Sequence, residues 1–395
     1  MSKRQNLAAV ALLCGALGVG GWTFYFGAFA GVLGEGWMVF YNAVRLYFDG
    51  QLGLLYDGVQ STALLNARFT HWLAHPLPLH PWLYPPHALL LLLPFGWLPF
   101  APAGILFLAL GFAATVAATW RFATTGVERA IHAVSLVLCP AAAFTVCLGQ
   151  NTFVTSALLL AGFGTVRRRP ILGGALLGIV TYKPQLCLMV PVALIAARQW
   201  KALAAAAGAA LLLAAASVAL FGLEPWRAWI ALMTEPNALY TQWEAIARIN
   251  GQSIYTYASL LGAPAAVANL AQTLAVIGSA GCVFWCYRRP MVDDLRLAVL
   301  LAATILAAPH VIDYDTLLLG IAATLFFVRG YRDGFRFGEI TVAVLVWASP
   351  LINPPTVFRL GFVTPLLVVL FIGCIIARGR RDAAQAAPGG VLTPA

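Results

Sequence analysis

The sequence predicts an all-α integral membrane protein, built as a multi-span helical bundle, and two observations support this class. Hydrophobic residues make up 61% of the 395 residues and charged residues only 10%, whereas a soluble domain has about 25% charged residues. Apolar stretches close to the roughly 20 residues that cross a bilayer as a helix recur along the whole chain. Because the bilayer interior offers the backbone no water, such stretches cross it as helices.

We expect about twelve transmembrane helices. The expected spans are 7–33, 102–120, 130–147, 151–166, 171–182, 186–198, 202–222, 264–287, 293–308, 311–328, 337–352 and 361–378. The first of them also resembles a secretory signal peptide, with "AFA" (28–30) in the place of a cleavage site. Its apolar run exceeds the roughly 7–15 residues of a signal peptide, so we interpret it as a retained span.

The segment "PPHALLLLLPFGWLPF" (85–100) is predicted to be re-entrant rather than a full crossing. Its apolar core is bounded by prolines, and a helix of about 14 residues covers about 21 Å of a hydrocarbon core of about 30 Å. A full crossing would also move the downstream basic clusters to the opposite side of the membrane.

The net charge of +10 is explained by membrane topology rather than by a nucleic-acid partner. The basic residues lie in short clusters between apolar runs, and with a cytoplasmic N-terminus 18 of the 24 lysines and arginines fall on one side. The positive-inside rule assigns that side to the cytosol. We therefore expect both termini to be cytoplasmic, and the seven cysteines, all within apolar runs, to form no disulfide framework.

One domain is expected over residues 1–380, because no polar linker interrupts the pattern, followed by a disordered cytoplasmic tail over 381–395. Two long external loops, 34–84 and 223–263, are rich in aromatic and polar residues. Apolar residues at helical spacing within them predict amphipathic helices at the membrane surface. These helices are expected at 36–50, 61–77 and 225–261.

Side chains that could carry chemistry are predicted to gather on the external side. They are the carboxylates Glu35, Asp49 and Asp57 of the first external loop and the joints "GQN" (149–151), "TYKPQ" (181–185) and "PHVIDYD" (309–315). Ionisable groups at membrane depth are costly, so a functional role is the starting hypothesis for them.

Each of these groups also has a structural interpretation. Lys183 precedes a helix-breaking proline and could extend outward to water. His310 follows Pro309 at an expected helix start, where free N–H groups attract anions, but a hydrogen-bonded structural histidine has the same pattern. Asp313 and Asp315 point to different helix faces, so only one is expected to face a cavity, and one of them is a candidate helix cap.

The histidine-rich stretch "HWLAHPLPLHPWLYPPH" (71–87) raises the question of a metal. His71 and His75 have a usable ligand spacing, but no acidic residue lies near them in the sequence, so we expect no metal site. The aromatic residues of this stretch suit a membrane-interface belt or a sugar-stacking surface. The "GQN" segment is a turn or, through its side-chain amides, a site for sugar hydroxyls.

Five pieces of the sequence occur in an order known from one enzyme family. They are "VFYNAVRLYFDGQLGLLYD" (39–57), "YPP" (84–86), "LGQN" (148–151), "YKPQ" (182–185) and "PHVIDYD" (309–315). With them the chain resembles glycosyltransferase family 87, the polyprenyl-phosphate-mannose-dependent transferases of the GT-C class. The resemblance covers residues 35–380.

This resemblance implies a GT-C-like bundle that moves a sugar, usually mannose, from a polyprenyl-phosphate donor to a lipid or glycan acceptor, with inversion. It implies an active site at the external face of the bacterial inner membrane, in contact with membrane lipids, and no cofactor or metal. It also implies a donor-phosphate site at Lys183 and His310. The implied pocket residues are Tyr41, Tyr84, Gln150, Asn151, Gln185, Tyr314 and Asp315.

The chain departs from the family at the catalytic base. The family usually has an acidic residue just ahead of the Phe-Tyr pair, and here that position is Gly36, next to Glu35. Three interpretations of this glycine follow. Glu35 substitutes as the base, the alignment with the family is shifted by one residue, or catalysis is altered or lost. We expect Glu35 to be the base, with Asp49 and Asp57 as alternatives that lie in expected turns.

Two other functions stay open on sequence grounds. A transporter or flippase of lipid-linked saccharides would also need polar groups at membrane depth, but through the bilayer and on both of its faces. A catalytically altered relative that binds glycans would account for the glycine at position 36. Formation of a new glycosidic bond separates the transferase from both.

Overall fold

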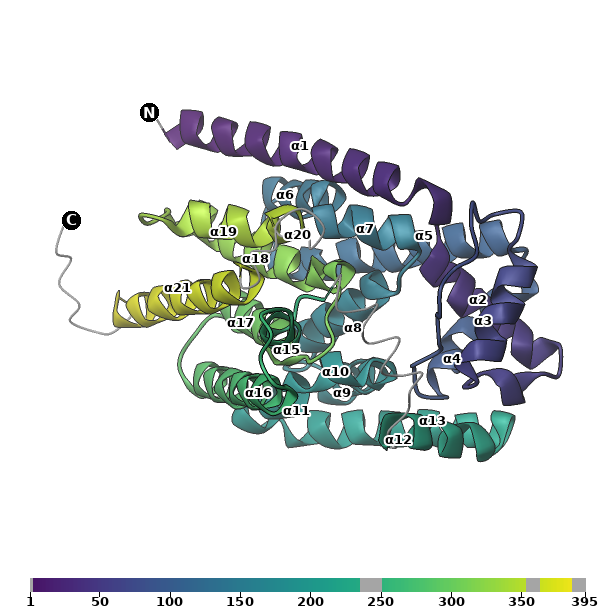
Figure 1. Cartoon of the computed structure of the whole chain (residues 1–395). Coiled ribbons are helices and arrows are strands. Elements are labelled where there is room, and N and C mark those ends of the chain that lie inside the picture. The colour runs from purple at the N-terminus through teal and green to yellow at the C-terminus, as the bar shows by residue number, and fades with distance from the viewer. Residues whose placement is uncertain (1–2, 235–250, 353–362, 386–395) are drawn as a thin grey trace.

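The computed structural model describes residues 3–234, 251–352 and 363–385, and these residues form helices joined by short turns. Within them the extended backbone pairs at one isolated bridge, between Gly251 and Ile312. The all-α class predicted from composition is therefore confirmed. Figure 1 shows the helices gathered into one bundle, with a lobe of shorter helices at the end opposite α21.

Five helices in the described ranges are long and apolar enough to cross a membrane. They are α1 (Lys3–Ala28), α5 (Phe100–Thr119), α12 (Trp200–Phe221), α16 (Ala265–Arg288) and α21 (Val363–Gln385). A sixth crossing is available if α6 (Gly126–Leu138) and α7 (Pro140–Leu148), which are bent by 54° at their joint, form one broken span. The bend falls at Pro140, which cannot continue the backbone hydrogen bonds of α6.

The other expected spans are represented by shorter helices. They are α8 (Thr152–Thr165), α9 (Pro170–Ile179), α11 (Met189–Ala196), α17 (Asp293–Ala307), α18 (Leu317–Asp333), α19 (Glu339–Trp347) and α20 (Ser349–Ile352). The 3₁₀ turn η5 (Val180–Tyr182) extends α9, and α10 (Pro184–Cys187) precedes α11.

The core of the bundle is formed by α17 and α18. Nearly all their apolar side chains are buried, including the run from Leu297 to Ala303. A helix that is apolar on every face belongs at the centre of a bundle. Accordingly, α17 packs against α11, α16, α18 and α21.

Helix α1 lies against the outside of the bundle, along α6 and α7 (Figure 1). A Cβ atom at Gly18 would lie 2.6 Å from the carbonyl oxygen of Leu138, and one at Gly21 would lie 3.1 Å from the Cβ of Pro140. The two glycines therefore allow α1 to approach the α6–α7 joint closely, as small residues do in membrane helix pairs.

The lobe at the other end contains α2 (Glu35–Phe48), α3 (Gly58–Arg68), α4 (Ala88–Leu92) and η3 (Leu93–Trp97). Its core is aromatic and continues into the bundle, where the ring of Trp37 stacks on Phe107 of α5 at a centroid distance of 5.0 Å. The short length of the apolar element Ala88–Trp97 agrees with the expectation that 85–100 is no full crossing.

The surface helices expected in the long loops are found with different bounds. Helix α2 matches the expectation for 36–50, but the helix expected at 61–77 begins at Gly58 and ends at Arg68. The prediction was wrong beyond that point because prolines at 76, 78 and 81 remove backbone donors. In the second loop, α13 (Glu224–Thr234) and α15 (Ile254–Leu260) are formed, and 235–250 lies outside the described residues.

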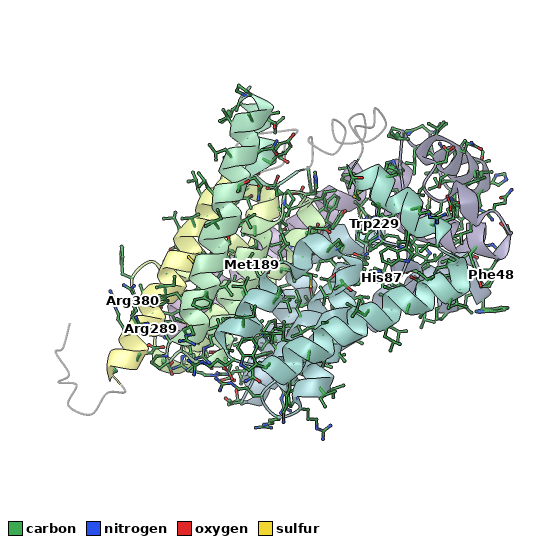
Figure 2. All side chains as sticks on the ribbon, turned by 90° about the horizontal axis from the view of Figure 1, so that it is seen from below. Phe48, His87, Met189, Trp229, Arg289 and Arg380 are labelled. Carbon is green, nitrogen blue, oxygen red and sulfur yellow. The ribbon has the colours of Figure 1, made fainter. Side chains whose placement is uncertain are left out.

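The basic residues expected on one side of the membrane gather at the end of the bundle away from the lobe. Figure 2 shows Arg289 and Arg380 at one end of the molecule and Phe48 at the other. Both guanidinium groups lie over the ring of Trp285, at 5.6 and 4.8 Å from its centroid. Such cation–π contacts hold the ends of α16 and α21 together.

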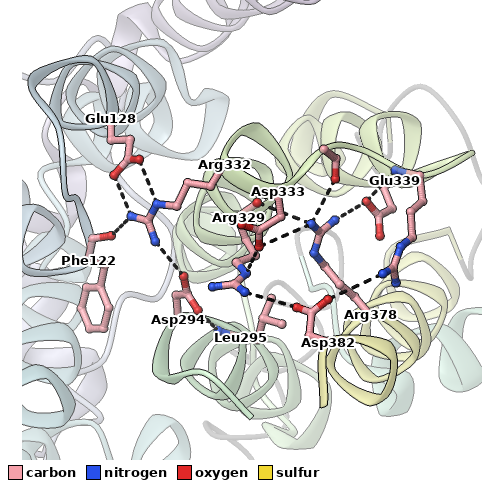
Figure 3. Close-up of polar contacts among 12 residues, drawn as sticks. Phe122, Glu128, Asp294, Leu295, Arg329, Arg332, Asp333, Glu339, Arg378 and Asp382 are labelled. Carbon is pink, nitrogen blue, oxygen red and sulfur yellow. Dashed lines mark hydrogen bonds and ion pairs between the residues drawn. The ribbon is translucent and has the colours of Figure 1, made fainter. Parts of the chain in front are cut away.

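A network of ion pairs ties five helices at this basic end (Figure 3). Arg332 of α18 contacts Glu128 of α6 at 2.7 Å and Asp294 of α17 at 3.3 Å. Arg378 of α21 contacts Glu339 of α19 at 2.5 Å. Because α21 continues to Gln385, the tail expected over 381–395 is helical up to that residue, and 386–395 lies outside the described residues.

Candidate active site

Polar side chains from five separate segments meet where the lobe joins the bundle. We call this group the polar cluster and define it as Glu35, Tyr84, Asn151, Lys183, Tyr314 and Asp315. Its segments are the start of α2, the loop before α4, the α7–α8 joint, the η5–α10 joint and the 3₁₀ turn η7 (Asp313–Thr316).

A buried ion pair lies at one side of the polar cluster. The Nζ of Lys183 lies 2.5 Å from an oxygen of Asp315, and the two side chains are only 2% and 3% exposed. Pro184 ends the preceding helical turn, which directs Lys183 into the bundle. The alternative in which Lys183 extends outward to water is therefore wrong for this structure.

Tyr314 connects this ion pair to Glu35. The Nζ of Lys183 lies 5.1 Å from the centroid of the Tyr314 ring. Tyr314 is also within electrostatic reach of Glu35, Tyr84 and Asp315. A carboxylate from α2 and a cation from the η5–α10 joint thus both lie within electrostatic reach of the same aromatic side chain.

Glu35 lies in the first turn of α2. Gly34 precedes it in the left-handed conformation, with φ of 75°, which glycine adopts without strain. The Glu35 side chain is 18% exposed, and an oxygen of its carboxylate lies 3.9 Å from Nε2 of His80. Burial raises the pKa of Glu35, while His80 and, less strongly, His75 act against this rise.

The position where the family has its acidic residue is closed in this chain. A Cβ atom at Gly36 would lie 2.2 Å from the side-chain nitrogen of Gln150 and 2.9 Å from the carbonyl oxygen of Leu148. The amide of Gln150 therefore occupies the space that a side chain at position 36 would need, and Glu35 supplies the carboxylate in the first turn of α2.

The α7–α8 joint presents oxygen atoms without partners. Within the described residues, the side-chain oxygens of Gln150, Asn151, Thr152 and Ser156 are buried and accept or donate no hydrogen bond. Buried polar atoms are normally paired, so this group is suited to the hydroxyls of a polar ligand. Beside it, the Tyr182 hydroxyl contacts the carbonyl oxygen of Asn151 at 3.3 Å.

Aromatic rings line the approach from the lobe. Tyr84 stacks on Tyr182 with ring centroids 6.4 Å apart. Tyr41 is part of the lobe core, where its hydroxyl donates to the carbonyl oxygen of Leu98 at 2.8 Å. Gln185 lies half-buried on α10, two residues beyond Lys183.

The alternative carboxylates have structural partners. Asp49 forms ion pairs with Arg45 at 2.7 Å and Arg68 at 2.9 Å, and the hydrogen bond from Arg68 lowers its pKa. Asp57 caps α3, because its side chain accepts from the backbone N–H of Gln60 at 2.9 Å.

His310 is not at a helix start, so that prediction was wrong. Helix α17 ends at Ala307, and the next helical turn is η7, which begins at Asp313. The backbone between them bends at Pro309 and His310 and then pairs with another loop, where the N–H of Gln252 donates to the carbonyl of Val311 at 2.7 Å. His310 is half-buried in this segment.

The two aspartates of the same stretch do diverge as predicted. Asp313 accepts a hydrogen bond from the side chain of Gln252 at 2.5 Å, whereas Asp315 faces Lys183. In the described part of the chain, no group of three or more His, Cys, Asp or Glu side chains could hold a metal ion.

Two contributors to the site were missed by sequence reasoning. Tyr182 was quoted within the joint "TYKPQ" but was given no role, although it directly precedes Lys183. His80 was considered only within a histidine-rich stretch and a metal question. Its position between two prolines in an external loop was the available indication that its ring is held in a fixed place.

The fold and the polar cluster together define a class: a helical membrane protein with a buried acid, a buried cation and amide groups at one end of its bundle. The family model of glycosyltransferase family 87 matches residues 82–309, more than half of the chain, and the protein belongs to this family. It is thus a membrane glycosyltransferase, which uses a sugar donor and an acceptor. No curated protein and no solved structure matches the chain.

The matched range divides the polar cluster. It includes Tyr84, Asn151 and Lys183, but it begins after Glu35 and ends before Tyr314. The family assignment therefore rests on the central part of the chain, while the assignment of the acid rests on the geometry around α2.

Proposed function

We propose that this glycosyltransferase moves a sugar, with mannose as the first candidate, from a polyprenyl-phosphate donor to a lipid or glycan acceptor with inversion. The observation that carries the proposal is that Lys183, paired with Asp315, lies 5.1 Å from the centroid of the Tyr314 ring, and that Glu35 is within electrostatic reach of the same tyrosine. This arrangement puts a proton acceptor and an anion-binding group at one site, as transfer from a lipid phosphate requires.

In the proposed reaction Glu35 is the general base. Its carboxylate takes the proton of an acceptor hydroxyl, whose oxygen then attacks the anomeric carbon. The bond between that carbon and the phosphate oxygen breaks, and the polyprenyl phosphate leaves with the electron pair. Lys183 stabilises the charge that develops on the leaving phosphate.

Asp315 has a defined part in this proposal. A buried ammonium group needs a counter-charge, because removing a lone ion from water is costly. The contact of 2.5 Å provides this counter-charge while no phosphate is bound. His310, in the bend ahead of η7, is proposed as a second contact to the donor phosphate.

The sugar is proposed to lie against the α7–α8 joint. The amide oxygens of Gln150 and Asn151, which are buried and unpaired among the described residues, accept hydrogen bonds from sugar hydroxyls. Tyr84 and Tyr182 offer stacked rings at the side of this position.

The membrane arrangement belongs to the same proposal. We propose that the basic end of the bundle faces the cytosol of a bacterium and that the polar cluster opens at the external face of the inner membrane. About twelve crossings, with 85–100 re-entrant, would make the bundle GT-C-like.

The direct test is transfer by purified protein in detergent, from a panel of labelled polyprenyl-phosphate sugars to membrane lipid extracts. We expect Glu35→Gln to lose about 10²–10⁴-fold in rate, the usual contribution of a general base. Asp49→Asn serves as the matched control and should transfer normally. Undiminished turnover by Glu35→Gln would remove Glu35 from this role, and movement of the donor across a membrane without a new glycosidic bond would favour a transporter.

A further inference from the structure

The segment that carries His80 is fixed by side chains of α3. Asn66 accepts the backbone N–H of Leu77 at 2.8 Å and donates to the carbonyl oxygen of Leu77 at 3.0 Å. One turn earlier on the same helix, the hydroxyl of Thr62 accepts the backbone N–H of His80 at 3.0 Å. The backbone is thus held at the histidine itself and three residues before it.

The ring of His80 has a defined tautomer. Its Nδ1 lies 3.0 Å from the carbonyl oxygen of Pro78. A carbonyl oxygen can only accept, so Nδ1 carries a proton. The other nitrogen, Nε2, faces Glu35 at 3.9 Å.

This distance is that of an ion pair rather than of a hydrogen bond. A neutral His80 would present the lone pair of Nε2 to the carboxylate of Glu35, which is unfavourable. A protonated His80 presents an N–H and a positive charge. The pair is therefore stable as imidazolium and carboxylate, or with the proton on Glu35.

The surroundings of Glu35 make the charge on His80 important. Burial of Glu35 disfavours its carboxylate, and His80 is the nearer of two histidines that act against this effect. Cys147 and Tyr314 also face Glu35 from α7 and η7. His80 is thus the cationic group closest to the acid.

We propose that His80 is a positioning residue for the transfer reaction, and that its imidazolium holds Glu35 as the carboxylate that receives the proton of the acceptor hydroxyl. This inference rests on the proposed function. The side chains of His80 and Glu35 are 23% and 18% exposed, so solvent can remove between turnovers the proton that Glu35 has received. Bond making and breaking at the sugar stay as described above.

The first test compares pH profiles of sugar transfer for the wild type and His80→Gln. At about pH 6 we expect His80→Gln to be about tenfold slower than the wild type, because an adjacent cation favours the carboxylate of Glu35 by at least that factor. At about pH 8.5 the alkaline solution favours the carboxylate of Glu35 without help from an adjacent cation, so the two rates should converge. His71→Gln, an exposed histidine of the same segment, is the control and should follow the wild type.

A second variant separates charge from structure. His80→Lys keeps a positive charge at every pH of the assay, so its rate at about pH 6 should exceed that of His80→Gln. A loss of rate that is equal at all pH values, and equal in both variants, would show a merely structural role and would overturn the inference.

An infrared titration of the carboxyl group tests the pairing without using activity. The band of Glu35 is identified by its absence in Glu35→Gln, and its midpoint should move to higher pH in His80→Gln. An unchanged midpoint would overturn the role of His80. If the midpoint shifted but Glu35→Gln still transferred sugar fully, the pairing of His80 with Glu35 would stand and the role of Glu35 as the base would not. That result would reject the proposed function, and with it the role of His80 in transfer.

Discussion

At the scale of single residues, Gly36 and Gln150 share one space, so the residue at position 36 determines where the Gln150 side chain can lie. A Cβ atom at this position would lie 2.2 Å from the amide nitrogen of Gln150, so the amide would have to shift. We expect Gly36→Ala to displace this amide and to lower transfer. Gln150→Ser, which shortens the side chain, should relieve part of the loss, although the carbonyl of Leu148 at 2.9 Å remains.

A double-mutant cycle of transfer rates measures this relation. Neighbouring residues that share space show coupling of about 0.5–3 kcal/mol, and we expect a favourable coupling in this range. Strictly additive losses would mean that Gly36 and Gln150 do not contact each other in the working enzyme.

The ionised form of Glu35, which is the form that acts as a base, is expected to lower the stability of the folded protein. Burial raises the pKa of Glu35 above its value in the unfolded chain, so the folded state holds a proton that the unfolded state has lost. The stabilising contribution of that proton is complete below the unfolded pKa and is lost as pH rises through the folded one. Glu35→Gln should therefore have a higher unfolding midpoint than the wild type at about pH 8, and a smaller difference at about pH 4. Thermal unfolding in detergent at both pH values checks this.

The Lys183–Asp315 pair gives the third prediction at this scale. Lys183→Met leaves a buried carboxylate without its partner, which costs about 3–5 kcal/mol in comparable cases. The double change Lys183→Met with Asp315→Leu removes both charges and should recover most of the unfolding midpoint but not the transfer activity. If the single change left the midpoint unaltered, the buried pair would not exist in the folded protein.

At the scale of elements, α3 acts as a clamp on the proline-rich segment before α4. Asn66 contacts both backbone groups of Leu77, and each lost hydrogen bond leaves a polar group unpaired at a cost of about 1–3 kcal/mol. We expect Asn66→Ala to accelerate amide hydrogen exchange over residues 74–82 and to leave exchange in α5 unchanged. Thr70→Ala is the control, since Thr70 is exposed and bonds only to the last turn of α3.

Elements also show where sequence reasoning reached its limit. The apolar pattern over 130–147 was interpreted as one span, yet it is two helices bent by 54°. The pattern does contain the cause, because Pro140 cannot donate to the turn before it. Helix α1 also contacts the joint through Gly18 and Gly21, and no local pattern within 130–147 carries that contact.

At the scale of the whole molecule, the basic end with Arg289 and Arg380 lies opposite the lobe that contains α2, α3 and α4 (Figures 1 and 2). We expect Trp72→Cys, at an exposed position of the lobe, to react with a membrane-impermeant maleimide in intact cells. Phe337→Cys, exposed beside Arg336 at the basic end, should react only after the membrane is opened. Equal labelling of both in intact cells would contradict the proposed orientation.

Much of the site could be named from sequence, and its arrangement could not. Lys183 and Asp315 were proposed as site residues because ionisable groups at membrane depth are costly. Their contact, however, joins residues 132 positions apart in the sequence. His310 was misplaced because a proline can precede a helix or an extended segment, and the partner that decides, Gln252, lies in another loop. His80 belongs to none of the sequence motifs that indicated the family.

Composition and apolar periodicity by themselves determined that this chain is a helical membrane protein, because the bilayer interior favours an apolar side chain at each position independently of its tertiary contacts. The order of short motifs was enough to indicate its family. The tertiary structure decided which acid faces the site, what fills the space at Gly36 and which histidine stands beside Glu35. These depend on contacts between helices, whose energies arise from distance and burial rather than from the order of residues along the chain.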